Sequence, residues 1–125
     1  MGIQTEPAPN AVRDAIERFN TAFNTHDVDA IMALMTEDCI FENTNPPPDG
    51  ARVVGQAAVR AEWVALFAGS PHAHFSEEEC FTVGDRGVVR WIYTWGSPVS
   101  GHIRGVDVFR VRDGKIAEKF SYVKG

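Results

Sequence analysis

The first half of the chain carries apolar residues at helical spacing. Apolar or small side chains recur every three to four positions between residues 11 and 23, with charged residues opposite, which predicts an amphipathic helix. Asn10 is placed to cap this helix, and residues 1–9, which include two prolines, predict a loose leader. Asp27 predicts the cap of a short second helix with inward residues between positions 28 and 35, and residues 55–67 predict a third helix.

The remainder of the chain has the pattern of strands. β-Branched and aromatic residues predict a short strand over residues 38–44 and four longer strands over residues 75–83, 87–95, 103–111 and 115–123. Residues 45–50 contain three consecutive prolines and predict a loop, and Asp113-Gly114 is typical of a tight turn between strands. Because the helices precede a meander of strands, the pattern predicts an α+β fold with helices on one face of an antiparallel sheet.

One acidic residue interrupts an apolar strand. Successive side chains of a strand alternate between faces, so Asp107 shares a face with Phe109 and Val111, whereas Arg104 and Arg110 share the wetter face. An ionised carboxylate on the apolar face costs several kcal/mol unless it is paired, hydrogen-bonded or protonated. Asp107 is therefore either the functional group of a pocket or a buried structural residue that accepts hydrogen bonds.

Large aromatic residues share one face of the strand predicted over residues 87–95. The residues at its odd positions are Val89, Trp91, Tyr93 and Trp95. They form either the wall of a pocket or ordinary packing between the sheet and the helices, because aromatic residues dominate both settings.

The strand predicted over residues 75–83 contains three consecutive glutamates, and the alternation of side chains decides which of them face the core. If Phe75, Phe81 and Val83 face the core, Glu77 and Glu79 face it too, which makes Glu79 a second candidate acid or base. A β-bulge would reverse that assignment.

Composition narrows the classes of protein. A chain of 125 residues predicts a single domain over residues 1–125 that needs no disulfide or metal, and two isolated cysteines predict small buried residues in a reducing compartment. A formal charge of −5 disfavours nucleic acid as a partner, and the N-terminal residues show neither a secretory signal nor a membrane span, which predicts a cytoplasmic protein. His72 and His74 lack a visible third ligand, so we expect no metal site.

The order of elements, together with three segments, resembles a known fold family. The segments are HDVDAIMALMTEDCIFEN (residues 26–43), GQAAVRAEW (residues 55–63) and GVDVFRVRDGKI (residues 105–116). They resemble the nuclear-transport-factor-like superfamily, and its SnoaL-like and ketosteroid isomerase-like members most of all. The resemblance implies three N-terminal helices on a strongly curved antiparallel sheet, a cone-shaped α+β barrel that encloses a small-molecule pocket.

The family's catalytic positions are only partly filled. The resemblance to ketosteroid isomerases places Asn43 where the family has its base, Phe19 where it has a tyrosine, and Asp107 where it has a protonated acid. Asn43 cannot take a proton and Phe19 cannot donate one, which argues against that isomerisation. The resemblance to SnoaL-like cyclases places Ser121 where those enzymes have an acid–base aspartate.

We therefore expect a pocket for a hydrophobic carbonyl compound, with proton transfer at Asp107 and no organic cofactor. The predicted ligand contacts are Asn43, Phe19, Phe41, Trp63, Glu79, Trp91, Tyr93, Phe109, Ser121 and Val123. The alternative is a non-catalytic binding or interaction module with a vestigial cavity. In either case the resemblance implies a homodimer formed through the arginine-bearing face of the sheet.

Overall fold

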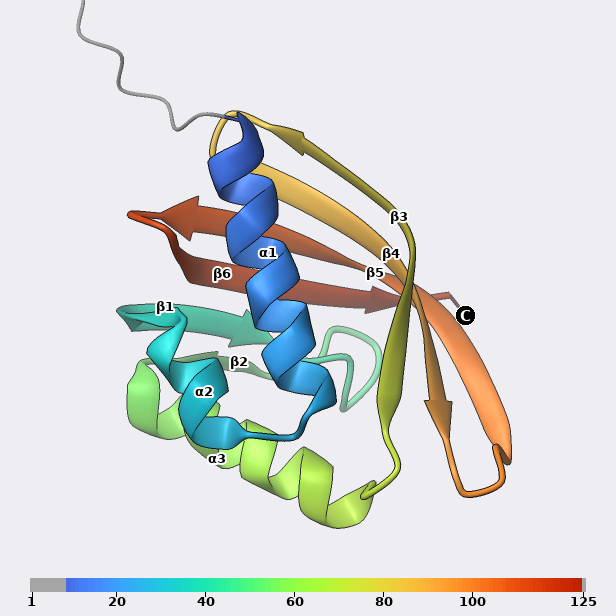
Figure 1. Ribbon diagram of the computed structural model, residues 1–125. Coiled ribbons are helices and arrows are strands. Elements are labelled where there is room, and N and C mark those ends of the chain that lie inside the picture. The colour runs from blue at the N-terminus through green and yellow to red at the C-terminus, as the bar shows by residue number, and fades with distance from the viewer. Residues whose placement is uncertain (1–8, 125) are drawn as a thin grey trace, which may run out of the picture.

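A computed structural model describes the backbone of residues 9–124 and the side chains of residues 11–124. Three helices and six strands follow one another in the order shown in Figure 1. The helices are α1 (Pro9–Asn24), α2 (Val28–Ala33) and α3 (Gln56–Gly69). The strands are β1 (Met35–Glu42), β2 (Arg52–Val54), β3 (His74–Val83), β4 (Arg86–Trp95), β5 (Gly101–Arg112) and β6 (Lys115–Val123). The predicted α+β class is confirmed.

The strands form one open, mixed sheet in the order β2-β1-β6-β5-β4-β3. β1 runs parallel to β6, with Phe41 opposite Lys119, and the other neighbouring strands are antiparallel. The sheet was expected to be entirely antiparallel and closed like a barrel, and both expectations are wrong, because the observed sheet is mixed and open. The long connection through α3 and the meander lets β6 return parallel to β1, and β2 and β3 remain as free edges.

Strand β2 and the start of α1 also differ from the sequence prediction. β2 has only three residues and follows the proline-rich loop, so its pattern is too short to be recognised, yet it pairs with β1 through Val53 and Phe41. Helix α1 begins at Pro9, a favoured first helical residue, so Asn10 lies inside the helix and is not its cap. The predicted leader otherwise lies outside the described residues.

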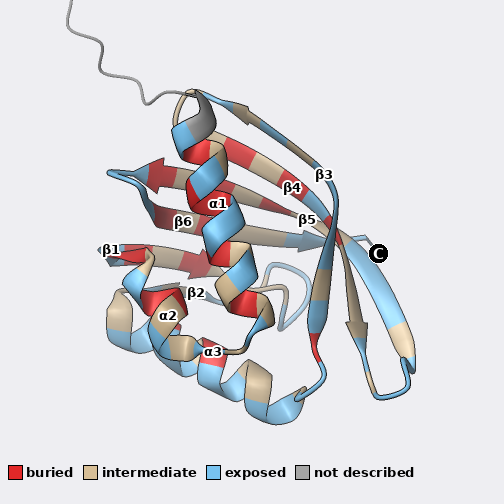
Figure 2. Cartoon of the chain, in the orientation of Figure 1, coloured by how far each residue is buried: buried red, intermediate tan, exposed pale blue. Residues whose placement is uncertain are grey.

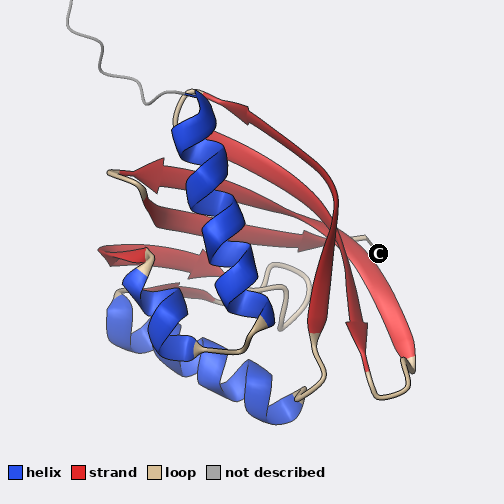
Figure 3. Ribbon diagram, in the orientation of Figure 1, coloured by secondary structure: helices blue, strands red, loops and turns tan. Residues whose placement is uncertain are grey.

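All three helices lie on one side of the sheet, which curves around α1 (Figures 1 and 3). The expected stripe of α1 is confirmed, because Val12, Ile16 and Phe19 are fully buried against the strands. Buried residues gather where the helices face the sheet (Figure 2). Asp27 caps α2 as predicted, since its carboxylate accepts a hydrogen bond from the Ala30 N–H at 3.1 Å.

An irregularity in β3 reverses its side-chain alternation. Glu77 lies opposite Trp91 and Glu79 lies opposite Arg90, so one extra residue separates the two pairs. Of the two alternatives for this strand, the structure has the bulge, so Phe81 and Val83 do not face the core. Phe81 is 52% exposed and Val83 is 75% exposed, on the outer face of the sheet.

The described helices were also compared with what a membrane-spanning helix requires. Across residues 9–124, none of them combines the length and the apolar character that crossing a lipid bilayer requires.

Candidate functional site

Asp107 lies in the middle of β5 and faces the helices, as the alternation predicts. Only 4% of its surface is exposed. One carboxylate oxygen accepts a hydrogen bond from the Ser121 hydroxyl at 2.7 Å, and the other lies 3.3 Å from the Lys119 ammonium nitrogen. The buried carboxylate thus has both the pairing and the hydrogen bond that its position requires.

Lys119 is the partner that the sequence analysis missed. It lies on β6 directly opposite Phe109, one diagonal step from Asp107, and is 5% exposed. Its ammonium also donates a hydrogen bond to the Ser121 hydroxyl at 3.0 Å. The alternation of side chains along β6 could have revealed it. Ser121 was expected at the pocket, and residue 119, two positions earlier, shares its face of the strand.

Three aromatic rings surround the Lys119 ammonium. Its nitrogen lies 5.0 Å from the ring centroid of Phe41, 5.5 Å from that of Trp63 and 5.6 Å from that of Phe23. These are cation–π distances, and such contacts are strongest where water is excluded. Phe41 and Trp63, predicted as pocket walls, therefore pack around the lysine instead of lining the cavity.

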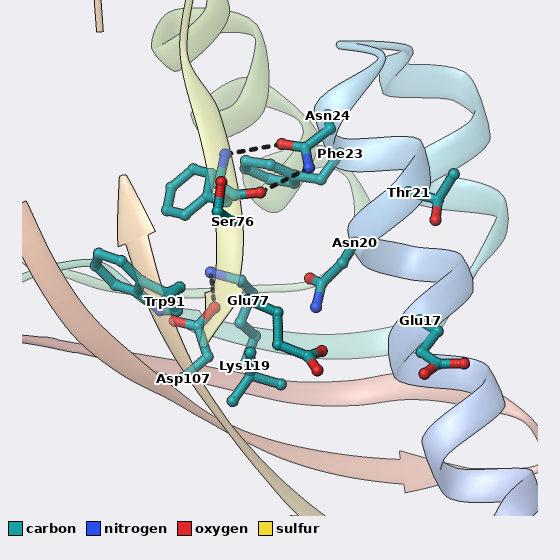
Figure 4. Close-up of a pocket in the computed structure, with 12 residues that line it drawn as sticks. Glu17, Asn20, Thr21, Phe23, Asn24, Ser76, Glu77, Trp91, Asp107 and Lys119 are labelled. Carbon is teal, nitrogen blue, oxygen red and sulfur yellow. Dashed lines mark hydrogen bonds and ion pairs between the residues drawn. The ribbon is translucent and has the colours of Figure 1, made fainter. Parts of the chain in front are cut away.

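A cavity of about 360 Å³ opens between α1 and the sheet, above Asp107 and Lys119. Its volume falls in the range of small-molecule sites. Figure 4 shows the carboxylate and the ammonium beside Trp91, with polar side chains of α1 across the space. The lining residues are Glu17, Asn20, Thr21, Phe23, Asn24, Phe75, Ser76, Glu77, Val89, Trp91, Asp107 and Lys119.

Helix α1 supplies the polar side of the cavity and ties it to β3. The Asn24 side chain donates to the Phe75 carbonyl at 2.8 Å and accepts from the Phe75 N–H at 2.9 Å. Both backbone groups of this edge-strand residue are thereby satisfied. Asn20 and Asn24 follow Ile16 at four-residue spacing. The helical periodicity of the sequence therefore predicts that these two asparagines lie beside the buried stripe of α1.

The bulge in β3 decides which acidic residue reaches the cavity. Glu77 lines it and lies 3.7 Å from the Arg13 guanidinium of α1. Glu79, the predicted second acid or base, instead pairs with Arg90 at 3.0 Å on the outer face. The assignment of Glu79 to the pocket is therefore wrong, for the reason that the bulge alternative anticipated.

Several other predicted contacts lie away from the cavity. Phe19 and Phe109 are core residues whose ring centroids lie 5.8 Å apart. Asn43 donates through its amide to a Glu62 carboxylate oxygen at 3.0 Å, which engages the side chain predicted as a ligand anchor. Tyr93 stacks on Phe75 at 4.7 Å, and Val123 is 42% exposed. Among the predicted contacts, Trp91 lines the cavity, and Ser121 supports Asp107.

The outer face of the sheet carries paired charges. As predicted, the arginines of β5 point away from the helices: Arg104 lies 3.2 Å from Glu78, and Arg110 lies 2.7 Å from Asp85. Burial raises the pKa of both cysteine thiols, Cys39 and Cys80, and neither forms a disulfide. The cysteines therefore add no reactive group to the site.

Gly105 makes room for the Trp91 wall. A Cβ atom at residue 105 would overlap with the Tyr122 carbonyl oxygen and with the Trp91 ring. We expect Gly105→Ala to displace the ring and to lower the free energy of unfolding by about 1–3 kcal/mol. Urea unfolding measures the loss, and Gly69→Ala, where a Cβ would meet nothing within 4 Å, is the control. Equal stability of the wild-type and Gly105→Ala proteins would contradict this packing.

Comparisons with known proteins agree with this architecture. An NTF2-like protein of unknown function from Mesorhizobium loti is 39% identical over 100% of both chains, with a TM-score of 0.81. A candidate polyketide cyclase from Sinorhizobium meliloti is 24% identical, over 87% of this chain and 94% of that one, with a TM-score of 0.76. A candidate ketosteroid isomerase from Kribbella flavida is 17% identical, over 94% of this chain and 80% of that one, with a TM-score of 0.78.

Sequence comparison identifies the family. No curated protein is significantly similar to the chain. The model of the SnoaL-like domain, however, matches residues 16–119, which include the C-terminal half of α1, Asp107 and Lys119. The chain therefore belongs to the SnoaL-like domain family and has the NTF2-like, ketosteroid isomerase-like fold.

Proposed function

We propose that this protein binds a hydrophobic carbonyl compound in the cavity between α1 and the sheet and catalyses proton transfer on it. The observation that carries the proposal is the buried Asp107–Lys119 pair at the base of a cavity of about 360 Å³. A carboxylate and an ammonium side by side offer a proton acceptor and a hydrogen-bond donor to one small molecule. The cyclase and isomerase descriptions of structural neighbours are compatible with this class of chemistry.

In this proposal the two groups have separate roles. Lys119 donates to the carbonyl oxygen of the substrate, and the Asp107 carboxylate takes a proton from the adjacent carbon. The ammonium then stabilises the negative charge that develops on the oxygen, an interaction that water-poor surroundings strengthen. Return of the proton at another carbon completes an isomerisation. This arrangement makes Asp107 the base, in place of the position that Asn43 occupies.

The walls favour an apolar substrate body. Phe23, Phe75 and Trp91 present ring surfaces to the cavity, and its polar side chains come mainly from α1 and from residues 76 and 77 of β3. An apolar ring system gains free energy by leaving water for these walls, and its carbonyl group can reach the charged pair.

Deuterium exchange with a model ketone tests the proposal. We expect the wild-type protein to accelerate exchange of the α-protons of 2-tetralone in D₂O, measured by NMR. Asp107→Asn should lose at least about 100-fold of the acceleration, because it removes the proton acceptor. Glu79→Gln, which neutralises an outward carboxylate on β3, should retain it. Equal exchange by the Asp107→Asn and wild-type proteins, both shown to be folded by circular dichroism, would refute the role of Asp107.

The alternative function is a non-catalytic module that dimerises through the outer face of the sheet. It is favoured by exposed apolar side chains on that face, including Phe81 and Tyr122. That alternative expects a filled interior around Asp107. The open cavity beside the carboxylate therefore supports the small-molecule proposal.

A further inference from the structure

We propose that Lys119 binds its carbonyl ligand covalently, as an iminium ion formed between its Nζ atom and an aldehyde or ketone carbon. This inference rests on the proposed function, because it concerns the same cavity and the same class of ligand. In the proposed function Lys119 only donates a hydrogen bond to the carbonyl group. Here Lys119 is instead a nucleophile that forms a covalent bond with the carbonyl carbon.

The position of the amine supports this role. The chain has three lysines, and two of them, Lys115 and Lys124, are exposed at the ends of β6. Lys119 alone is buried, and it lines the cavity. Nucleophilic attack requires the neutral amine, and the Asp107 carboxylate, 3.3 Å from the Lys119 nitrogen, lies close enough to accept its proton.

The surroundings of Nζ suit the product as well as the reactant. An iminium carries one positive charge at the same nitrogen as the ammonium. It would therefore keep the three aromatic rings at 5.0–5.6 Å and the Asp107 carboxylate at 3.3 Å as stabilising neighbours. The charged pair is retained, so condensation does not leave a buried carboxylate unpaired.

Asp107 is placed to carry the protons of the condensation. The carboxylate takes one proton from the Lys119 ammonium, and the neutral nitrogen attacks the carbonyl carbon. The C–O π electrons move to oxygen, which is protonated by Asp107 to give a carbinolamine. Asp107 accepts a second proton from nitrogen and returns it as the C–O bond breaks. The ammonium and the carbonyl compound thus become an iminium that keeps one N–H, plus one water, and the carboxylate is regenerated.

Covalent binding raises the acidity of the neighbouring C–H bond. The positive nitrogen withdraws electrons from the former carbonyl carbon, so Asp107 removes the α-proton to leave a neutral enamine. The same carboxylate therefore serves both the condensation and the proton transfer of the proposed function.

Reductive trapping tests the covalent step. The wild-type protein is incubated with 2-tetralone and sodium cyanoborohydride, which reduces an iminium to a stable amine. Chymotryptic peptides analysed by mass spectrometry then locate the adduct. We expect Lys119 to be modified at least ten times faster than Lys115 and Lys124. Lys119→Arg should abolish the fast adduct, and Lys115→Arg should leave it unchanged.

Each outcome separates this inference from the proposed function. Modification confined to the exposed lysines and the N-terminal amine, or no adduct at all, overturns the inference. If the wild-type protein still accelerates deuterium exchange in that case, the proposed function stands with Lys119 as a donor. A fast Lys119 adduct without deuterium exchange upholds covalent binding and refutes the proton-transfer function. Because the wild-type peptide map gives the answer, the test stays decisive even if Lys119→Arg fails to fold.

Discussion

Lys119→Met is expected to lower the free energy of unfolding by about 3–5 kcal/mol at neutral pH. The substitution preserves most of the side-chain volume but removes the charge that pairs with Asp107 across 3.3 Å. A buried carboxylate left without its partner retains its full desolvation penalty. Urea unfolding of the wild-type and variant proteins measures the difference.

A double variant distinguishes loss of the partner from loss of packing. Replacing both charges, as in Asp107→Leu with Lys119→Met, should recover most of the lost stability, because two apolar side chains leave no unpaired charge. Arg90→Met is the matched control, since it breaks the ion pair between Arg90 and Glu79, two side chains that are each 52% exposed. This substitution should lower the free energy of unfolding by less than about 1 kcal/mol. A loss at Lys119 no larger than the loss at Arg90 would contradict the buried pair.

Phe109→Ala is expected to lower the free energy of unfolding by about 3–5 kcal/mol. Phe109 is fully buried and meets the Phe19 ring edge-on, at 72° between the ring planes, so truncation leaves a void in the centre of the core. Chemical denaturation followed by tryptophan fluorescence measures the loss.

Phe81→Ala is the control for that prediction. Strict alternation along β3 would place Phe81 in the core, whereas the bulge places it on the outer face at 52% exposure. We expect its replacement to change the free energy of unfolding by less than about 0.5 kcal/mol. A loss comparable to that of Phe109→Ala would mean that the β3 bulge is absent in solution.

Local signals in the sequence predicted the helices and the long strands well. Strand β6 has the predicted bounds, and Asp113-Gly114 forms the turn before it, with both residues at positive φ. The errors have a non-local origin. The parallel pairing of β1 with β6 depends on how distant segments meet, and the bulge near Glu78 has no glycine or proline to reveal it.

The candidate site was predictable only in part, for a similar reason. Asp107 was found because an acidic residue in an apolar strand is conspicuous within a few positions. Lys119 was missed because a lysine in a strand usually lies on the wet face, and its partners come from four different elements. The cavity is a volume between α1 and the sheet, and no run of residues encodes a volume directly.

The parallel pairing of β1 with β6 has a consequence for assembly of the site. It brings Phe41 directly opposite Lys119, although the two residues are distant in the sequence. Closing so long a loop is entropically expensive, and contacts of this kind tend to form late in folding. A folding intermediate with the β3–β6 meander but without β1 would place Lys119 beside Asp107 and lack the Phe41 ring. The charged site is therefore complete only once β1, from the first half of the chain, has paired with β6, from the second half.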